Sequence, residues 1–235
     1  MQPLADLTVT VLVGGLGTRL RPVVADRPKA LAEVGGRPFL EYVLDRLTRA
    51  GLRRVVLCTG YLGTQVQAAF GSRRGILDLV YSQEPEPLGT AGALRLALPL
   101  VLSDTVLIVN GDSYSDADLG LFREWHHRRG ARASVTLVHA LETGRYGQVQ
   151  LRADGSVAAF REKEAGAGPG WINAGQYLVD RNLLAEIPAG RAVSLEGEMF
   201  PAWVGRGLYA WQSDARLLDV GTPESYAAAG RFFAS

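Results

Sequence analysis

The chain has 235 residues, of which 47% are hydrophobic, 21% charged and 8% aromatic. A chain of this length and composition folds as a globular domain, which excludes intrinsic disorder and a small fold held together by disulfides. Lys and Arg number 25 against 24 Asp and Glu, and this balance excludes a basic surface for binding nucleic acid.

The single cysteine and the hydropathy pattern narrow the class of protein further. Cys58 lies in an apolar run, so we expect a buried thiol, and one cysteine cannot build a disulfide framework or a Cys-based zinc site. No apolar stretch reaches the roughly 20 residues of a membrane span. Residues 1–9 lack the charged start and the cleavage site of a signal peptide. We therefore expect a cytoplasmic protein without a membrane partner, and a homo-oligomer is compatible with this sequence.

In the first half of the chain, apolar runs typical of strands alternate with segments of helical period. Residues 8–13 predict a buried strand, and apolar side chains at helical spacing predict a helix from Phe39 to Leu47. Further strands are predicted at RVVLCTG, LDLVYS and TVLIVNGD, and further helices around residues 66–70 and at TAGALRLAL. This alternation predicts a largely parallel, doubly wound sheet.

The pattern changes after residue 130. The runs ASVTLVHA, YGQVQL, VAAFREK and NAGQYLV follow one another with short turns, which predicts antiparallel or mixed strands. Helices are predicted at 195–204 and 223–233, and residues 166–170 read as a loop inside the domain rather than a boundary. We therefore expect one domain over residues 1–235 with an α/β fold, a Rossmann-like open mixed sheet with helices on both faces.

The first candidate for a ligand site is a glycine-rich segment, residues 14–20, directly after the first strand. Ligands of open α/β sheets bind beyond the carboxyl ends of the strands, and glycine N–H groups can cradle a phosphate chain. The dinucleotide pattern GxGxxG fails because Leu20 stands at its third glycine, and the pattern GxxxxGK[ST] is absent. An ordinary tight turn would account for the glycines alone. It would not account for the cations that follow, which are Arg19, Arg21, Arg27 and Lys29.

Two carboxylates form the second candidate feature. Asp112 ends the most strand-like run of the sequence, and Asp219 ends a short apolar run before a helix. Each could be a turn-capping aspartate. Carboxylate oxygens are also the ligands that Mg²⁺ prefers, and Mg²⁺ commonly combines one or two of them with substrate phosphates. Two such carboxylates beside a basic glycine loop are the groups that phosphoryl or nucleotidyl transfer requires.

The run GGLGTRLRPVVADRPK resembles the GGxGTRLxPxTxxxPK motif of sugar-1-phosphate nucleotidylyltransferases, with Val24 in place of the usual Thr. Later segments resemble further motifs of that family in the same order, namely EPLGTAGAL, NGDSY, FREK, INAGQYLV, SLEGEMFP and DVGTPESY. The resemblance therefore covers nearly the whole chain. It is closest to guanylyltransferases of mannose 1-phosphate and of D-glycero-D-manno-heptose 1-phosphate.

The resemblance implies that a nucleoside triphosphate and a sugar 1-phosphate react to give an NDP-sugar and pyrophosphate, with GTP as the favoured triphosphate and Mg²⁺ as the cofactor. Its implied catalytic residues are Arg19, Lys29, Asp112 and Asp219, with Asp112 and Asp219 as the metal ligands. Its implied nucleotide-binding residues are Val13, Gly14, Gly15, Gly17, Thr18, Arg19, Gln83, Gly89 and Thr90. Its implied sugar-phosphate-binding residues are Tyr146, Gly147, Glu162, Lys163, Asn173 and Glu196.

Other functions and other residues stay open at this point. The sugar could be a heptose or a similar sugar or cyclitol, and the base could be uracil, thymine or adenine. A non-catalytic, sugar-nucleotide-sensing relative and a nicotinamide-dependent dehydrogenase are the alternatives from other classes. The retained charged residues disfavour the first and the failed GxGxxG pattern disfavours the second. We expect His126 and His127 to lie on a solvated helix face, and Trp171 to pack or to stack on substrate.

Overall fold

The computed structural model describes residues 4–20, 22–24, 26–144, 148–161 and 168–234. Ten strands form one mixed sheet, whose main path runs β11-β10-β12-β7-β1-β4-β6-β5, with β9 added on β12 and β13 on β9. These strands are β1 (Thr8–Leu12), β4 (Arg54–Thr59), β5 (Arg73–Arg74), β6 (Leu77–Gln83), β7 (Thr105–Asn110), β9 (Ala133–Ala140), β10 (Gln148–Leu151), β11 (Val157–Arg161), β12 (Gly170–Asp180) and β13 (Leu208–Ser213). The predicted open mixed sheet is confirmed.

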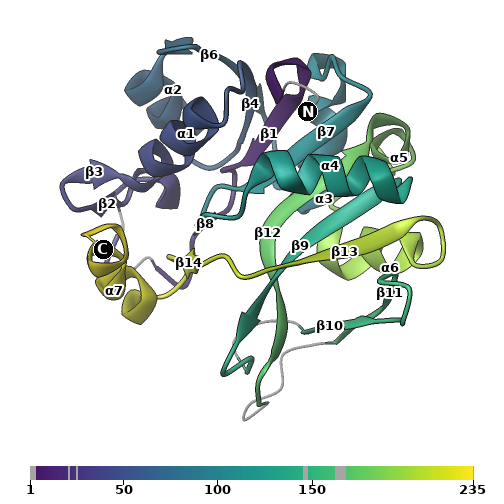
Figure 1. Cartoon of the computed structure of the whole chain (residues 1–235). Helices are drawn as coiled ribbons and strands as arrows, with labels where there is room; N and C mark the ends of the chain where they lie inside the picture. The colour runs from purple at the N-terminus through teal and green to yellow at the C-terminus, as the bar shows by residue number, and fades with distance from the viewer. Residues whose placement is uncertain (1–3, 21, 25, 145–147, 162–167, 235) are drawn as a thin grey trace.

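The first half of the chain builds the parallel part of the sheet, in the upper part of Figure 1. Strand β1 lies between β4 and β7, β6 continues the row, and these four strands are mutually parallel. The residues of β1, β4 and β7 are mostly buried on both faces, as a covered parallel sheet requires, whereas Asp78 and Gln83 of β6 are exposed. In β7, for example, Leu107 packs into the core on one face while Val106 and Ile108 pack into the core on the other.

Helices cover both faces of the sheet, as predicted. The core on one face takes in side chains of α1 (Phe39–Arg49), α2 (Gly63–Phe70) and α4 (Leu119–Arg129). The core on the other face takes in α3 (Gly89–Ala97), α5 (Arg181–Ala185) and α6 (Phe200–Trp203). Cys58 is buried against α3, as expected. None of the helices that the structure describes is long and apolar enough to cross a membrane.

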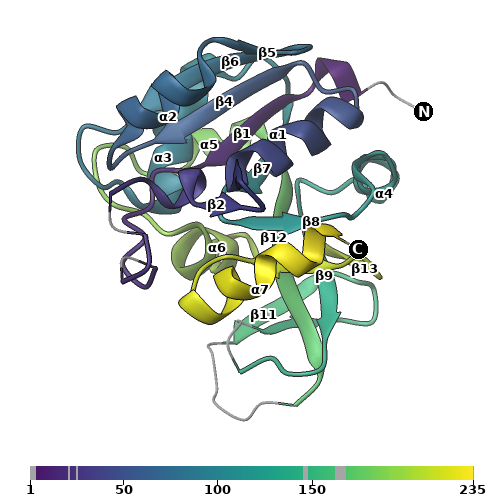
Figure 2. The ribbon, with the colours of Figure 1, turned by 90° about the vertical axis from the view of Figure 1, so that its left-hand side faces the viewer.

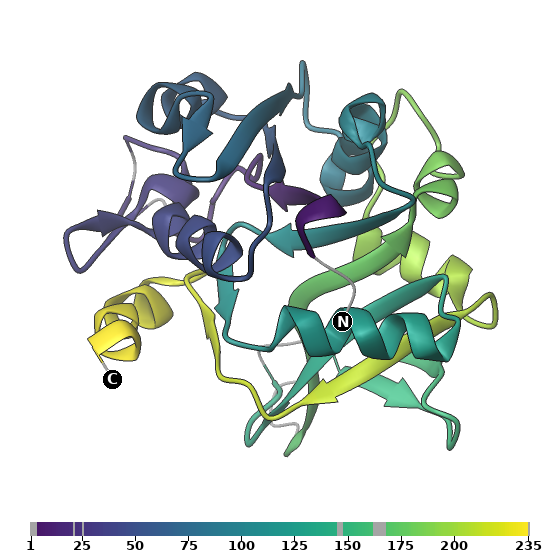
Figure 3. The same ribbon diagram turned by 45° about the horizontal axis from the view of Figure 1, so that its top comes forward.

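The second half of the chain adds the strands at the bottom of Figure 1, which pair antiparallel with one another except that β13 runs parallel to β9. The long strand β12 pairs antiparallel with β7, β9 and β10, and its register against β9 shifts between Asn173 and Tyr177. Helix α4 lies along β9 and β13 (Figure 3), where Phe122 stacks on Trp211. The expected helix at 195–204 is a π-helical turn, Leu195–Met199, followed by the short α6 with Pro201 in its first turn.

Two short pairs of strands lie outside the large sheet. Strand β2 (Glu33–Val34) pairs with β3 (Arg37–Pro38), and β8 (Ser113–Ser115) pairs antiparallel with β14 (Leu217–Asp219). The chain ends in α7 (Pro223–Ala234), which passes close to β14 and β2 on the side seen in Figure 2. Single 3₁₀ turns are found at Leu4–Asp6, Lys29–Leu31 and Leu98–Leu100.

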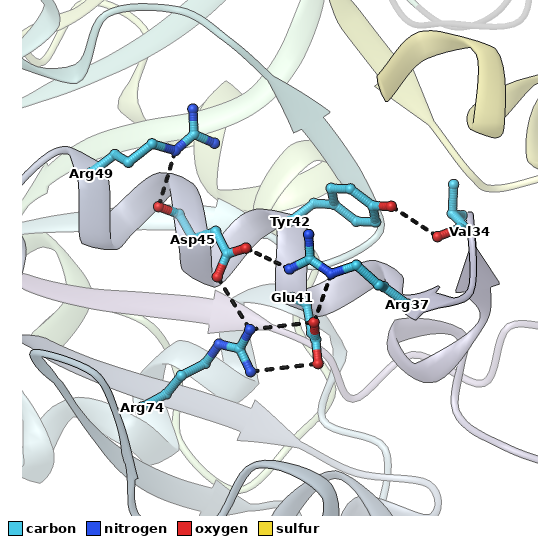
Figure 4. Close-up of polar contacts among 7 residues, drawn as sticks. All are labelled: Val34, Arg37, Glu41, Tyr42, Asp45, Arg49 and Arg74. Carbon is cyan, nitrogen blue, oxygen red and sulfur yellow. Dashed lines mark hydrogen bonds and ion pairs between the residues drawn. The ribbon is translucent and has the colours of Figure 1, made fainter. Parts of the chain in front are cut away.

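The outer side of α1 carries an ion-pair network (Figure 4). Arg37 donates to Glu41 and to Asp45, at 2.9 and 2.5 Å, and Arg74 from β5 reaches the same two carboxylates at 3.3 and 3.2 Å. Half-exposed pairs of this kind contribute little individually. The network ties the edge strand β5 and the β2–β3 pair to α1.

The prediction for the two histidines is wrong for His126. His127 is exposed, whereas His126 is 5% exposed and its Nδ1 lies 2.7 Å from Oγ of Ser134 on β9. Burial lowers the pKa of His126 to about 4, so this imidazole is neutral at pH 7. The polar residues that follow His126 in the sequence led to the wrong prediction, because the side chain of His126 faces the sheet.

Candidate active site

The glycine-rich segment, the end of β7 and the segment after β6 meet at one edge of the parallel sheet, because parallel strands end on the same side. Together they enclose a cavity of about 340 Å³. Its lining residues are Leu12, Val13, Gly14, Gly15, Leu16, Gly17, Thr18, Arg19, Lys29, Ala30, Glu84, Pro87, Gly89, Thr90, Ala93, Asn110, Gly111, Asp112 and Gly221. The expectation that Asp112 faces the same cavity as the glycine loop agrees with this geometry.

Two glycines of the loop are required by its geometry. A Cβ atom on Gly14 would lie 2.7 Å from Oε1 of Glu84 and 3.1 Å from the backbone nitrogen of Gly60. Gly17 has a φ of +60°, in the left-handed region that disfavours other residues. The loop backbone can therefore follow the cavity wall closely, and a ligand can approach its N–H groups without meeting side chains.

Lys29 lies between the two carboxylates. Its Nζ is 2.8 Å from Oδ2 of Asp112 and 3.9 Å from Oδ1 of Asp219, and its side chain is 12% exposed. Arg19 is exposed at the rim of the same cavity. Burial raises the pKa of Asp219 and the nearby Asp112 carboxylate raises it further, whereas Lys29 opposes both effects. The site therefore concentrates cations and carboxylates where an anionic ligand would enter.

The pairing of β8 with β14 brings Asp219 to Asp112 across more than a hundred residues of sequence. In this pair Asp219 lies opposite Ser113, the residue after Asp112, and the N–H of Val220 donates to the carbonyl of Asp112 at 3.0 Å. Within the described residues no group of three or more His, Cys, Asp or Glu side chains could hold a metal ion. Two hard carboxylates fit Mg²⁺ when substrate phosphates complete its coordination, and Lys29, which pairs with Asp112 in this structure, would then have to leave an oxygen of that carboxylate to the ion.

Glu84, and not the predicted Gln83, contributes to the cavity lining. Gln83 is exposed and does not line the cavity, whereas Glu84 is half-buried and does. Oε2 of Glu84 accepts the N–H of Leu88 at 2.8 Å, and burial raises the pKa of this carboxyl. Because consecutive residues of an extended chain point to opposite sides, Gln83 and Glu84 cannot both face the cavity, and no signal in the sequence says which of the two does.

The predicted sugar-side residues Asn173 and Glu196 belong to one hydrogen-bonded chain. Nδ2 of Asn173 donates to the hydroxyl of Tyr177 at 2.8 Å, and that hydroxyl donates to Oε1 of Glu196 at 3.3 Å. The hydroxyl of Thr90 donates to Oε2 of Glu196 at 3.1 Å and accepts the N–H of Leu195 at 2.7 Å. Sequence reasoning did not identify Tyr177, which is fully buried and links these two predicted residues.

The remaining predicted residues divide into two groups. Val13, Gly15, Thr18 and Gly89 line the cavity with the residues already described. Arg21, Tyr146, Gly147, Glu162 and Lys163 lie outside the residues that the structure describes. Trp171 was expected either to pack or to stack on substrate, and its ring packs edge-on against that of His139, with 5.4 Å between the ring centres.

Comparisons with known proteins agree with this geometry. Residues 8–235 match the family model described as nucleotidyl transferase. The chain is 37% identical over 225 residues to a mannose-1-phosphate guanylyltransferase of Mycobacterium tuberculosis, covering 94% of this chain and 63% of that protein's length. It is 36% identical over 217 residues to the D-glycero-alpha-D-manno-heptose 1-phosphate guanylyltransferase of Aneurinibacillus thermoaerophilus, covering 92% of this chain and 94% of that protein.

Solved structures give the same picture. The crystal structure of HddC from Yersinia pseudotuberculosis superimposes with a TM-score of 0.88 at 29% identity, covering 97% of this chain and 99% of that one. HddC complexed with GMP-PN superimposes with a TM-score of 0.85 at the same identity and coverage.

Proposed function

Because this chain belongs to the nucleotidyl transferase family, we propose that it is a guanylyltransferase that converts GTP and a sugar 1-phosphate into a GDP-sugar and pyrophosphate. The favoured sugar is a heptose 1-phosphate. The 36% identity over 217 residues to a heptose 1-phosphate guanylyltransferase supports this choice, and the 37% identity over 225 residues to a mannose-1-phosphate guanylyltransferase makes mannose 1-phosphate the alternative.

The position of Glu84 in the cavity carries the proposal for the base. Guanine presents N1–H and N2–H₂ as a donor edge, whereas the corresponding edge of adenine has no N1–H. Oε2 of Glu84 accepts the N–H of Leu88, Oε1 lies beside Gly14 of the glycine loop, and we propose that Oε1 accepts from such an edge. A base that leaves this half-buried acceptor unpaired would bind less well, so the geometry favours guanine.

The charged residues support the chemistry of transfer. An oxygen of the sugar phosphate attacks the α-phosphorus of GTP, the bond to the β-phosphate breaks, and pyrophosphate leaves with the bonding electrons. Because the attacking oxygen is already anionic, no general base is required. Arg19 and Lys29 are placed to neutralise the triphosphate, and Lys163 is proposed to hold the sugar phosphate.

Asp112 and Asp219 would hold Mg²⁺ together with the phosphates. Bound there, the ion would supply positive charge to the phosphoryl oxygens of the reacting centre. We further propose that residues 1–235 act as one catalytic domain in the cytoplasm and that a homo-oligomer is compatible with this activity.

The experiment that tests the proposal measures pyrophosphate release for the five common nucleoside triphosphates against a panel of sugar 1-phosphates. We expect GTP with a heptose 1-phosphate to have the highest kcat/KM, with ATP as the second purine. A dominant UDP- or dTDP-sugar product would overturn the choice of base and leave nucleotidyl transfer standing. Absence of pyrophosphate release with every pair would instead favour a non-catalytic relative.

A further inference from the structure

Arg46 differs from the other arginines around α1. Arg37 and Arg74 pair with carboxylates on the outer side of this helix (Figure 4), whereas Arg46 is 8% exposed and points into the molecule. Among the residues that the structure describes, no carboxylate lies within ion-pair distance of its guanidinium. A buried cation without an anionic partner is costly, and an apolar side chain of similar size would avoid that cost.

The contacts of Arg46 are with neutral groups from two separate segments. Its Nη2 donates to the carbonyl of Ala117 and lies 3.5 Å from Oε1 of Gln176 on β12. Its guanidinium also lies over the ring of Tyr114 on β8, 6.0 Å from the ring centre. Burial lowers the pKa of Arg46 to about 10, so the side chain still carries its charge at neutral pH.

Two of these contacts, with Tyr114 and Ala117, lie on or just after β8, the strand that follows Asp112, and the third, with Gln176, leads back to the same strand. Nε2 of the fully buried Gln176 donates to the carbonyl of Ser115 at 3.2 Å, so Arg46 and Gln176 hold adjacent parts of one short segment. Strand β8 pairs with β14, which ends at Asp219, and this pair is not part of the ten-stranded sheet. Arg46 therefore links α1 and β12 to the two strands that present both carboxylates to the cavity.

We propose that Arg46 is a positioning residue for the Asp112–Asp219 pair, acting through β8. The inference rests on the proposed function, in which this pair holds Mg²⁺. A planar guanidinium can donate in two directions at fixed geometry, which suits it to fix one backbone carbonyl and one amide oxygen at the same time. The Arg46 side chain thereby sets the distance between β8 and the large sheet, and with it the separation of the two carboxylates.

The test compares Arg46→Met and Arg46→Lys with Arg54→Met. Arg54 is a matched control because its guanidinium also donates to a backbone carbonyl, that of Leu100 at 3.2 Å, at the opposite end of the sheet. The measurements are the thermal midpoint, the affinity for Mn²⁺ in the presence of GTP without sugar phosphate, and kcat and KM for both substrates. Mn²⁺ is followed by electron paramagnetic resonance, which does not require turnover.

For Arg46→Met we expect Mn²⁺ affinity to fall about tenfold and kcat to fall by a similar factor, on the scale of one lost positioning contact. The KM for GTP should change less than about twofold, since no GTP contact is removed. Arg46→Lys should restore part of the Mn²⁺ affinity, and Arg54→Met should leave it unchanged. Should Arg46→Met fail to fold, Arg46→Lys carries the same comparison.

Unchanged Mn²⁺ affinity and kcat in a folded Arg46 variant would overturn the inference, whatever happens to the thermal midpoint. A loss of Mn²⁺ affinity equally large in Arg54→Met would overturn it as well. A wild-type chain that binds no Mn²⁺ with GTP would refute the metal site and the inference together. A wild-type chain that makes another NDP-sugar would refute the choice of base only.

Discussion

The parallel half and the antiparallel half of this molecule contribute to the site in different ways. Among the described lining residues, all but Gly221 belong to residues 12–112, and they act through loop backbone and through charged side chains at strand ends. The antiparallel half instead contributes buried side-chain contacts, such as Tyr177 with Glu196 and His126 with Ser134. The parallel half therefore forms most of the cavity lining, and the antiparallel half packs beside it through buried contacts.

The two halves also differ in how accessible their charged and polar side chains are to a ligand. The cavity keeps Lys29, Asp112 and Arg19 partly accessible, so they can exchange their contacts for those of a ligand. In the antiparallel half, polar side chains such as Tyr177 and His126 are buried and hydrogen-bonded within the protein, so they cannot do so without a loss of stability. Substitutions in the first half should change catalysis. Apart from Asp219, which is proposed to hold Mg²⁺ with Asp112, substitutions in the second half should change stability or the alignment of substrates.

The largest effect is expected for Asp112→Asn. A small loss of activity in this variant would contradict the division between a catalytic parallel half and a stabilising antiparallel half. The amide keeps the shape of the side chain but cannot pair with Lys29 or hold a cation as a carboxylate does. We expect kcat for pyrophosphate release to fall by about 10²–10³-fold, the scale of a lost preorganised electrostatic group, with an unchanged circular dichroism spectrum. The exposed Asp214→Asn is the charge-matched control and should retain full activity. Equal losses in both variants would contradict a specific role.

The second prediction concerns the stability of the antiparallel half in acid. The folded-state pKa of His126, lowered to about 4 mainly by burial, lies below the unfolded value of 6.5. The unfolded chain therefore binds this proton first as the pH falls, and stability drops between pH 6.5 and about 4. At about 1.4 kcal/mol per pH unit the loss approaches about 3 kcal/mol.

Urea unfolding across this pH range measures the effect of His126. The slope of stability against pH should become shallower in His126→Gln and stay as in the wild type in His127→Gln, because His127 is exposed. Identical slopes in all three proteins would show that His126 does not resist protonation.

The third prediction tests whether Glu84 in the cavity selects guanine over adenine. Glu84→Gln replaces the acceptor that faces Gly14 with an uncharged amide. We expect kcat/KM for GTP to fall about 10–100-fold relative to ATP, which corresponds to a lost charge-assisted hydrogen bond of about 1.5–3 kcal/mol. Gln83→Ala is the neighbouring control and should leave the ratio unchanged, since Gln83 is exposed. A change in the ratio for Gln83→Ala alone would restore Gln83 as the base contact.

The smallest effect is expected for Thr90→Val, at the contact between the two halves. Its hydroxyl is committed to Glu196 and Leu195, so its loss should misplace the sugar side rather than the nucleotide. We expect KM for the sugar 1-phosphate to rise about fivefold, equivalent to about 1 kcal/mol, with KM for GTP unchanged. Thr8→Val removes a similar hydroxyl acceptor, that of the Leu102 N–H at the far end of the sheet, and should change neither KM. A rise in KM for GTP would instead show that Thr90 contacts the nucleotide.

The parallel part of the sheet, and the strand ends at which Asp112 and the glycine loop lie, could be predicted from the residues beside them in the sequence. Both are local properties: apolar period identifies strands and helices, and parallel strands necessarily end at one edge. The burial of Cys58 followed for the same reason, since its neighbours are apolar on both sides along the strand.

Tertiary structure alone decided which polar side chains face inward. Glu84 lines the cavity because the segment after β6 lies beside the glycine loop, and His126 is buried on the side of α4 that contacts Ser134 on β9. Arg46 meets Gln176 across 130 positions of sequence and Thr90 meets Glu196 across 106. Contacts so distant in the chain leave no local period, because they depend on the packing of separate elements and not on the residues beside them.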